Sequence, residues 1–237
     1  MSQSFKFKQF IIHQDKCAMK IGTDGVLLGA WTPIAKHTDS ILDIGAGTGV
    51  ISLQMAQRCG AQTIDAIEID DLAHEQCTQN FEASPWTDRL FCYHASVQEF
   101  ASEIDEKYTL IISNPPFYRD TFKTESLSRD TARFEDALPF KHLLVCASHL
   151  LEDDGCFSVI IPKKEEDHFI QLASESNLYP LKICRVKGRP SAEIKRSMIL
   201  FSFKKQAPQI ETLVIETERH QYTTEYQKIV SNFYLKM

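Results

Sequence analysis

The stretch LDIGAGTGV, residues 42–50, decides the fold because a buried strand turns there into a helix around three glycines. Gly45, Gly47 and Gly49 allow a tight turn and a close approach of the backbone to a ligand. Polar groups of that ligand would meet the free N–H groups at the start of the helix. The spacing is G-x-G-x-G and differs from the G-x-G-x-x-G of dinucleotide folds. The loop by itself indicates an α/β protein that binds a cofactor carrying a nucleoside.

Strand-like and helix-like segments alternate on both sides of this loop, which is typical of a parallel sheet covered by helices. The expected parallel strands are residues 40–44, 63–68, 90–94, 108–113 and 156–161. The expected helices are near 48–58, 71–83, 96–103, 137–151 and 165–176. We therefore expect a Rossmann-like α/β fold with helices on both faces of a mainly parallel, seven-stranded sheet.

The sequence after residue 177 follows a different pattern. Two longer β runs, 178–187 and 196–204, leave no room for a crossover helix and predict an antiparallel hairpin at one end of the sheet. Residues 210–237 predict one more short strand and then a helix with apolar and aromatic residues at helical spacing. We interpret this aromatic stripe, which includes Tyr222 and Tyr226, as packing rather than recognition.

Length and composition predict one domain and exclude several classes of protein. The chain has 237 residues, of which 43% are hydrophobic and 24% are charged, as in ordinary soluble domains. No stretch approaches the roughly 20 apolar residues that span a bilayer, and MSQSFKFKQF has no signal-peptide core, so we expect a cytoplasmic protein without a membrane partner. Seven cysteines without C-x-x-C and eight histidines without ligand spacing argue against disulfides and a metal site. The sequence does not determine the oligomeric state, although a monomer is favoured.

The charges are unevenly distributed. The net charge of −6 argues against a uniformly basic nucleic-acid-binding protein, but residues 182–205 hold eight Lys/Arg against the single acid Glu193. Such a segment suits the docking of a polyanion, and it equally suits strand edges that lysine protects from pairing. Charge alone does not choose between these two interpretations.

A second signal for a nucleoside lies in IDAIEID, residues 64–70. Glu68 ends the strand after the glycine loop, where an acid can accept hydrogen bonds from both hydroxyls of a ribose. It does not distinguish a nicotinamide cofactor from S-adenosylmethionine, and a helix-capping acid is the structural alternative. Ser96 and Val97 follow the third strand, where such folds hold the adenine ring.

SNPPF, residues 113–117, ends the fourth strand. Two prolines lack the N–H that a buried strand would donate, so the strand must stop there. The carboxyl ends of neighbouring parallel strands converge on one crevice, which places Asn114 beside the glycine loop. A simple strand terminator is the alternative interpretation.

DIGAGTG followed by NPPF resembles the class I S-adenosylmethionine-dependent methyltransferases that act on planar amino groups. The resemblance implies that Asn114 Oδ1 and the carbonyl between the prolines accept the two hydrogens of the target amine. Pro115 and Pro116 would hold that carbonyl still, and Phe117 would stack on the plane of the amine. An adenine target would have to be single-stranded or flipped out of its stack.

The ends of the chain narrow the resemblance. FKQFIIHQDKCAMKIGTDGVLLGAW (7–31) and YTTEYQKIVSNFYLKM (222–237) are similar to the bacterial tRNA1(Val) adenine-N(6)-methyltransferase family, which modifies adenine 37, next to the anticodon of valine tRNA. The resemblance implies that residues 1–35 form an extension that closes over S-adenosylmethionine. The cofactor contacts it implies are Lys20, Gly22, Thr23, Asp24, Asp43, Gly45, Gly47, Gly49, Glu68, Ser96, Val97 and Asn114, although many relatives have an acid in place of Ser96. The RNA contacts are Tyr118, Arg133, Arg185, Lys187, Arg189, Lys195 and Arg196.

Three alternatives come from other functional classes. An N5-glutamine methyltransferase that acts on a release factor usually has N-P-P-Y and an additional amino-terminal helical domain, for which this chain has no room. A DNA adenine methyltransferase normally needs a separate target-recognition region. A non-catalytic cofactor-binding module would have little reason to keep N-P-P-F.

Overall fold

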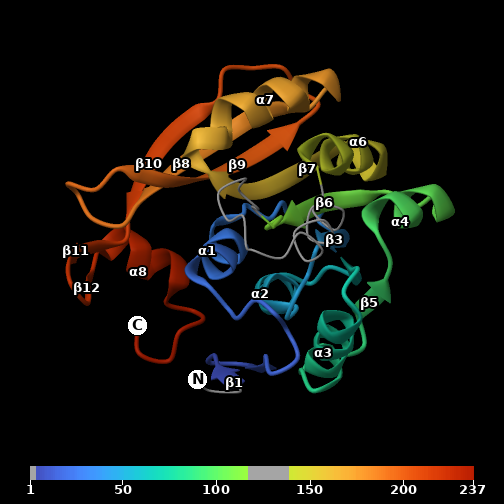
Figure 1. The fold of residues 1–237 in the computed structure, drawn as a ribbon, viewed down its shortest axis with the longest axis horizontal. Coiled ribbons are helices and arrows are strands. Elements are labelled where there is room, and N and C mark those ends of the chain that lie inside the picture. The colour runs from blue at the N-terminus through green and yellow to red at the C-terminus, as the bar shows by residue number, and fades with distance from the viewer. Residues whose placement is uncertain (1–3, 117–138) are drawn as a thin grey trace, which may run out of the picture.

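Eight strands form one central sheet in the order β10-β8-β9-β7-β6-β3-β4-β5 (Figure 1). The computed structural model describes residues 4–116 and 139–237. The strands are β3 (Ser40–Ile44), β4 (Thr63–Glu68), β5 (Leu90–His94), β6 (Tyr108–Ser113), β7 (Leu151–Pro162), β8 (Tyr179–Lys187), β9 (Ile194–Ser202) and β10 (Gln209–Val214). Strands β3 to β7 pair in parallel, and β9 is antiparallel to both β7 and β8. The predicted Rossmann-like fold with its terminal antiparallel hairpin is thus confirmed.

The sheet has one more strand than the seven that the sequence predicts. Residues Gln209–Val214 lie at the edge as β10 and pair in parallel with β8, from Gln209 opposite Lys182 to Val214 opposite Lys187. The sequence does predict a strand in this part of the chain, but its position in the sheet depends on a long-range pairing. Placing β10 there covers the backbone groups of β8 that would otherwise form an open edge.

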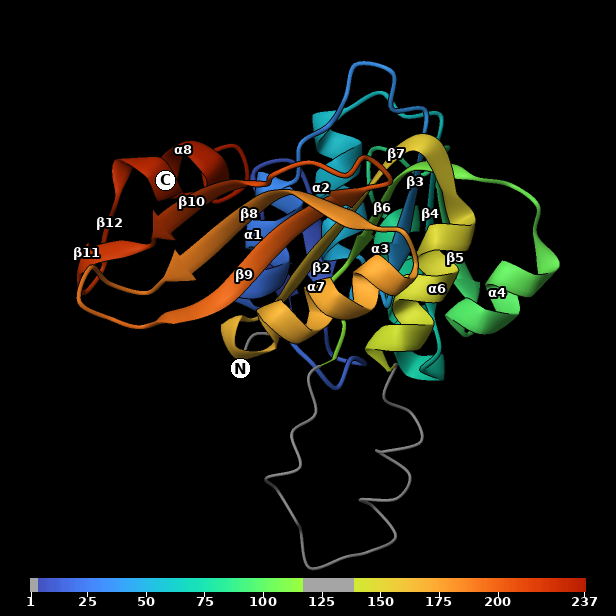
Figure 2. The ribbon, with the colours of Figure 1, turned by 90° about the horizontal axis from the view of Figure 1, so that it is seen from above.

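Helices cover both faces of the sheet, as the turned view in Figure 2 also shows. Their bounds are α1 (Thr23–Trp31), α2 (Val50–Arg58), α3 (Asp71–Glu82), α4 (Val97–Glu103), α6 (Phe140–Leu150), α7 (Glu166–Glu175) and α8 (Thr224–Val230), with a 3-10 turn η1 (Lys163–Glu165). Successive strand residues point to opposite faces, so Ile41 packs in one core cluster with α1 and α2 while Leu42 packs in the other with α6. None of the described helices is long and apolar enough to span a bilayer.

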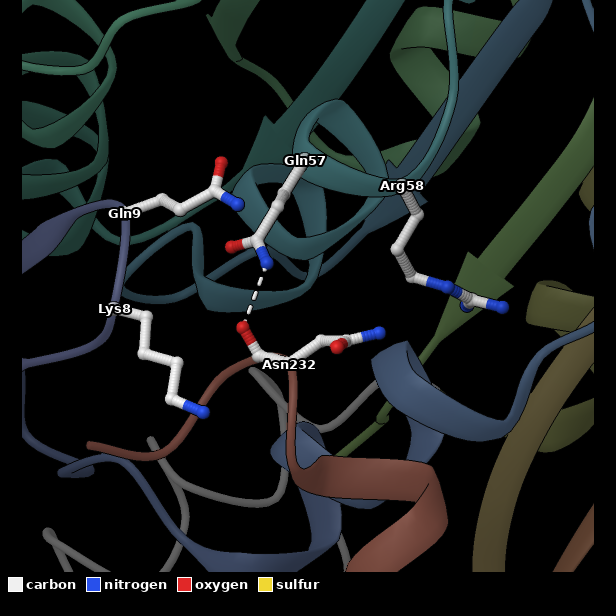
Figure 3. A pocket seen from close by; sticks show the side chains of 5 residues that line it. All are labelled: Lys8, Gln9, Gln57, Arg58 and Asn232. Carbon is white, nitrogen blue, oxygen red and sulfur yellow. Dashed lines mark hydrogen bonds between the residues drawn. The ribbon is translucent and has the colours of Figure 1, made fainter. Parts of the chain in front are cut away.

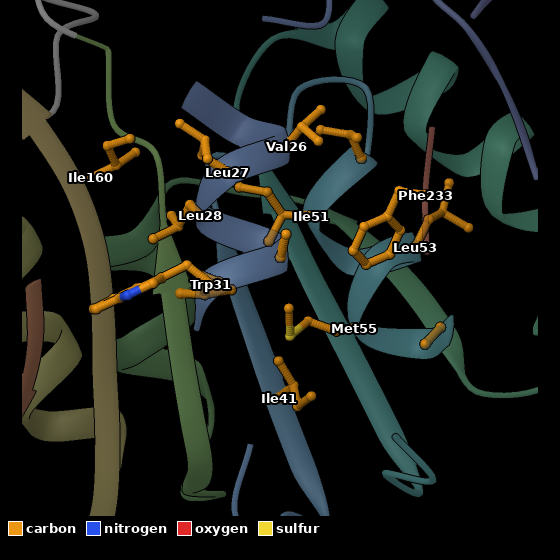
Figure 4. Packing of buried hydrophobic residues seen from close by; sticks show 14 of the residues in the cluster. Val26, Leu27, Leu28, Trp31, Ile41, Ile51, Leu53, Met55, Ile160 and Phe233 are labelled. Atoms are coloured by element: carbon orange, nitrogen blue, oxygen red, sulfur yellow. The ribbon is translucent and has the colours of Figure 1, made fainter. Parts of the chain in front are cut away.

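Helix α1 is almost entirely buried, and it brings the amino-terminal region into the core (Figure 4). Val26 and Leu28 are fully buried in the cluster that includes Ile51 of α2. A Cβ on Gly29 would lie 2.3 Å from Gln54 Oε1, so the glycine allows α1 and α2 to pack closely. The Gln54 amide then donates to the Val26 carbonyl at 3.1 Å. Helix α1 therefore packs closely against α2.

The two ends of the described chain lie side by side. The hairpin of β1 (Ser4–Lys6) and β2 (Ile11–His13) is followed along the chain by α1, while β11 (Glu216–Glu218), β12 (Gln221–Tyr222) and α8 follow β10. Phe7 forms a β-bridge with Tyr234, and Lys8 N–H donates to the Phe233 carbonyl at 2.8 Å. The carboxyl-terminal elements gather beyond the β10 edge, next to α1 (Figure 2).

Candidate active site

The glycine loop between β3 and α2 combines open space with close packing. Gly45, Gly47 and Gly49 have φ values of +75°, +55° and +76°, which residues other than glycine rarely adopt. A Cβ on Gly45 or Gly47 would meet no other heavy atom within 4 Å. One on Gly49 would lie 2.6 Å from Phe81 and 2.9 Å from Cys77. The first two glycines thus border space that a ligand can enter, whereas Gly49 is required by packing.

The carboxylate of Glu68 accepts three backbone hydrogen bonds, one of which comes from the glycine loop. Its Oε2 accepts from Gly47 N–H at 2.8 Å, and its Oε1 accepts from the N–H groups of Ile69 and Asp70 at 2.9 and 3.0 Å. The side chain is half-buried, and each carboxylate oxygen can accept more than one donor. The open glycines and this fixed carboxylate fit a cofactor with ribose hydroxyls.

Asp43 lies under the loop and is fully buried. Its Oδ2 accepts from the Ser52 N–H at 3.1 Å and the Ser52 hydroxyl at 2.7 Å, while Oδ1 has no hydrogen-bond partner among the described residues. Burial raises the pKa of Asp43 to about 7, and the hydrogen bonds from Ser52 offset only part of that rise. In this structure Asp43 fastens the first turn of α2 beneath the glycine loop.

Asn114 comes next to the same loop at the end of β6. Ser113 pairs with Ile44, and its hydroxyl donates to the Ile44 carbonyl at 2.8 Å, so β3 and β6 end together. A Cβ on Gly25 would lie 3.4 Å from Val50 Cγ1 and 3.8 Å from Asn114 Nδ2. Gly25, in the first turn of α1, therefore lies close both to Val50 at the start of α2 and to Asn114. The adjacent ends of β3 and β6 agree with the sequence prediction, whereas the position of α1 beside them was not predicted.

The prolines after Asn114 mark the limit of this part of the structure. Pro115 is buried and Pro116 is half-buried, at the carboxyl edge of the sheet. Phe117, Tyr118 and Arg133 lie outside the described residues. Their predicted roles in stacking and RNA contact stay predictions.

Asn80 of α3 is a buried polar residue that no sequence motif indicated. Its Oδ1 accepts from His13 N–H at 2.8 Å, and its Nδ2 donates to the carbonyls of His13 and Thr48, both at 2.9 Å. One fully buried amide thus ties the amino-terminal segment to the glycine loop. An asparagine close to Cys77 and Phe81 on the inner side of a helix is the signal that could have indicated it.

Residues 14–21 form a closed turn near Glu68. The Lys20 ammonium donates to the Gln14 and Cys17 carbonyls, and Ile21 N–H donates to Gln14 Oε1 at 2.9 Å. Burial, and after it the negative charge of Glu68, raises the pKa of the Cys17 thiol to about 11. Lys20 thus stabilises its own segment, which lies close to the carboxylate predicted to bind ribose.

The basic residues of β8 and β9 are divided between structural and exposed positions. Arg185 binds the carboxylate of Glu166, with Nη2 to Oε1 at 2.7 Å, and Arg196 Nε lies 2.7 Å from Asp24 Oδ2. Burial would raise the pKa of Glu166, but hydrogen bonds from Arg185 and Ser197 and the charge of Lys163 outweigh it and lower that pKa. Asp24, predicted as a cofactor contact, is thus paired with a predicted RNA contact.

The other three predicted phosphate contacts are less constrained. Arg189 lies 3.9 Å from Glu216, and the Lys187 ammonium donates to the Pro190 carbonyl at 3.4 Å. Lys195 is exposed and forms no ion pair with the described residues. These three side chains can therefore bind a polyanion more readily than Arg185, which is already bound to Glu166.

Ser96 and Val97 have local structural roles. Ser96 is the N-cap of α4: its hydroxyl oxygen accepts from Glu99 N–H at 3.2 Å, and Glu99 Oε2 accepts from Ser96 N–H at 2.9 Å. This is a capping box. Val97 is buried in the core cluster with α6. The expected contact of this turn with an adenine ring stays a prediction.

A polar cavity of about 540 Å³ lies elsewhere, at the carboxyl end of α2 (Figure 3). Its lining consists of Lys8, Gln9, Gln57, Arg58 and Asn232. The glycine loop is at the opposite end of α2, and none of the predicted site residues borders this cavity. The described residues contain no group of three or more His, Cys, Asp or Glu side chains that could hold a metal ion.

Comparison with known proteins decides the family. Residues 23–170 match the methyltransferase small domain family. A tRNA1(Val) (adenine(37)-N6)-methyltransferase of Flavobacterium psychrophilum is 59% identical over 233 residues, covering 98% of this chain and 100% of the relative. The chain belongs to this methyltransferase family. A Bacteroides fragilis protein of the same name is 45% identical, with full coverage of both chains.

Solved structures agree with the fold of the methyltransferase. A crystal structure described as a predicted O-methyltransferase from Agrobacterium tumefaciens has a TM-score of 0.69 at 20% identity, covering 89% of this chain and 96% of that one. The methyltransferase uses S-adenosylmethionine, as its family does, and the glycine loop with Glu68 suits that cofactor. The family and cofactor inferred from the sequence are therefore confirmed.

Proposed function

We propose that the protein transfers the methyl group of S-adenosylmethionine to the N6 amine of adenine 37 in valine tRNA, next to the anticodon. The observation that carries this proposal is the full-length identity of 59% to a relative of that name. The position of Asn114 beside the glycine loop supports the chemistry. The proposal includes a monomer that acts in the cytoplasm, where its tRNA substrate is found.

The chemistry requires positioning more than a strong base. The exocyclic amine of adenine is a poor nucleophile because its lone pair is conjugated into the ring. S-adenosylmethionine, when bound, supplies an electrophilic methyl group on a sulfonium. Asn114 Oδ1 and the Pro115 carbonyl would accept the two amine hydrogens and direct the lone pair, which lowers the barrier by orientation and preorganised dipoles. Phe117 would stack on the base.

The cofactor contacts follow from the part of the site that remains open. The cofactor would lie against the backbone of Gly45 and Gly47, and the Glu68 carboxylate would accept hydrogen bonds from the ribose hydroxyls. The closed turn of residues 14–21 and the start of α1 would cover it, because Asn80 holds that segment against the glycine loop. In this proposal Lys20 and Asp24 shape the cover through their contacts with Gln14, Cys17 and Arg196.

The RNA backbone would cross the turn between the end of β8 and the start of β9. Lys187, Arg189 and Lys195 supply charge there without determining sequence preference. Arg196 would join them if phosphate competes with Asp24, and Arg185 would contribute least because it is bound to buried Glu166. Tyr118 and Arg133 are further proposed contacts.

Methyl transfer from labelled S-adenosylmethionine tests the substrate. Unmodified total tRNA, a release factor and duplex DNA would be offered in separate reactions, and the label should enter tRNA. Label in the release factor with none in tRNA would instead support the N5-glutamine methyltransferase alternative. Mapping the modified nucleotide to adenine 37 would complete the test.

Asn114→Ala tests the role of the amide. Turnover should fall by about 10²-fold or more, as when one preorganised polar group is removed from an active site. The Kd for S-adenosylmethionine should change far less, because the glycine loop and Glu68 still hold the cofactor. Titration calorimetry and single-turnover methylation separate the two quantities. Normal turnover in this variant would contradict the proposed role in holding the amine.

A further inference from the structure

A second cavity, which we call the tyrosine cavity, opens beside the start of α1. Its volume is about 620 Å³, and it lies between the amino-terminal hairpin and the carboxyl-terminal segment. Three tyrosines, Tyr222, Tyr226 and Tyr234, belong to its lining. The family resemblance assigns no role to these residues, and the sequence pattern predicted packing for Tyr222 and Tyr226.

The tyrosines form an ordered aromatic wall. The rings of Tyr222 and Tyr226 stack with centroids 5.3 Å apart and planes at 28°. Tyr226 is buried, while Tyr222 and Tyr234 are half-buried, so packing accounts fully only for Tyr226. Phe5 meets Tyr234 edge to face at 6.0 Å and joins the wall from the other end of the chain. The wall therefore has aromatic surface left for a planar ligand.

Two lysines give the cavity a cationic rim. Lys6 and Lys236 line it, both are exposed, and neither forms an ion pair with the described residues. Glu216 in the lining lies 3.9 Å from Arg189, which partly offsets its charge, and the Met237 oxygen accepts from the Lys8 ammonium at 3.1 Å. A planar apolar surface bordered by positive charge is the combination that binds a nucleotide of single-stranded RNA: the ring stacks and the phosphate meets the cations.

The tyrosine cavity adjoins the candidate active site. Gly22 and Thr23 line it at the N-terminal end of α1. Gly25, whose Cβ position is 3.8 Å from Asn114 Nδ2, follows three residues after Gly22, or about 4.5 Å along a helix axis. A Cβ on Gly22 would meet no atom within 4 Å, so the space directly beside Gly22 is open.

We propose that the tyrosine cavity binds a nucleotide of the tRNA that flanks the target adenine, with its base against Tyr222 and its phosphate between Lys6 and Lys236. This inference rests on the proposed function. A target adenine that leaves its stack separates from its neighbours, and a second stacking site would hold one of them in place. The cavity would thereby position the RNA strand as the adenine enters.

The test compares Tyr222→Ala with Tyr222→Phe and with Tyr93→Ala. Tyr93 is an exposed tyrosine on β5, at the opposite edge of the sheet, and serves as the matched control. The probe is fluorescently labelled, unmodified valine tRNA, with Kd measured by anisotropy and the Kd for S-adenosylmethionine measured by calorimetry. Tyr222→Ala should weaken tRNA binding by about 5- to 150-fold, the range for one lost stacking contact, without weakening cofactor binding.

The outcomes distinguish a failure of this inference from a failure of the proposed function. Tyr222→Phe and Tyr93→Ala should bind tRNA like the wild type, since the ring is retained in one and is remote in the other. If Tyr222→Ala binds tRNA normally while the wild type methylates it, the inference is wrong and the proposed function stands. If the wild type neither binds nor methylates tRNA, the proposed function itself fails.

The lysines give a test that does not depend on core packing. A variant with both Lys6→Ala and Lys236→Ala removes only exposed side chains, so it should fold even if Tyr222→Ala does not. Its tRNA Kd should depend less steeply on salt concentration, because two phosphate contacts are lost. An unchanged salt slope would overturn the phosphate part of the proposal.

Discussion

Gly49→Ala should lower the free energy of unfolding by about 2 to 5 kcal/mol. Gly49 has a φ of +76°, and the left-handed region costs a residue with a Cβ roughly 1 to 2 kcal/mol. The added methyl would also lie 2.6 Å from Phe81 and 2.9 Å from Cys77, both on α3. Overpacking of this kind costs about 1 to 3 kcal/mol more. Urea denaturation of the cofactor-free protein measures the loss.

Gly47→Ala is the matched control, because it combines a similar backbone with open space. Its φ is +55°, and its new methyl would meet no atom within 4 Å. We expect only the backbone cost, about 1 to 2 kcal/mol. The methyl would stand where the cofactor is proposed to lie, so titration calorimetry should show weaker binding of S-adenosylmethionine.

The two variants together separate packing from binding. Equal losses of stability in Gly49→Ala and Gly47→Ala would refute the argument from the contacts with α3. Unchanged cofactor affinity in Gly47→Ala would mean that the space beside this glycine is not the binding site.

Three further predictions concern charged groups. Arg185→Ala leaves the buried carboxylate of Glu166 with only Ser197 and Lys163 as partners. The loss of these charged hydrogen bonds should cost about 1.5 to 3 kcal/mol of stability in urea denaturation, whereas a loss below about 1 kcal/mol would contradict this ion-pair role. Arg196→Ala should weaken tRNA binding and flatten its salt dependence; an unchanged slope would count against it. Asp43 holds its proton to about pH 7 when folded but releases it near pH 3.8 when unfolded, so its contribution to stability falls as pH rises between these values. Asp43→Asn should lack this fall, and parallel stability profiles of variant and wild type would refute the raised pKa.

The fold could be predicted because its signals are local. Alternating strand and helix patterns and the three glycines after SILDI are set by backbone conformation and by the period of burial. The eighth strand could be predicted as a strand, but not as an edge partner of β8. Its register, from Gln209 opposite Lys182 onward, joins residues far apart along the chain.

The sequence could predict those residues of the candidate site whose position follows directly from the end of a strand. Gly45, Glu68 and Asn114 each follow a strand, and parallel topology brings such ends together. The sequence indicated Arg185 as one of several basic residues that would contact RNA, but folding places it against Glu166. Asn80 was not recognised because its partners, His13 and Thr48, belong to two other segments.

The sequence by itself determined the class of fold, the glycine loop for the cofactor and the N-P-P-F motif at residues 114–117. Each of these depends on neighbouring residues and on the conformational freedom of their backbone. Tertiary structure alone decided which charged side chains pair within the protein and which amide joins the amino-terminal segment to the glycine loop. It also decided that Tyr222 and Lys6 line one cavity beside α1. The physical reason is that the energy of a buried charge or amide depends on the partner that folding brings to it, and local sequence does not specify that partner.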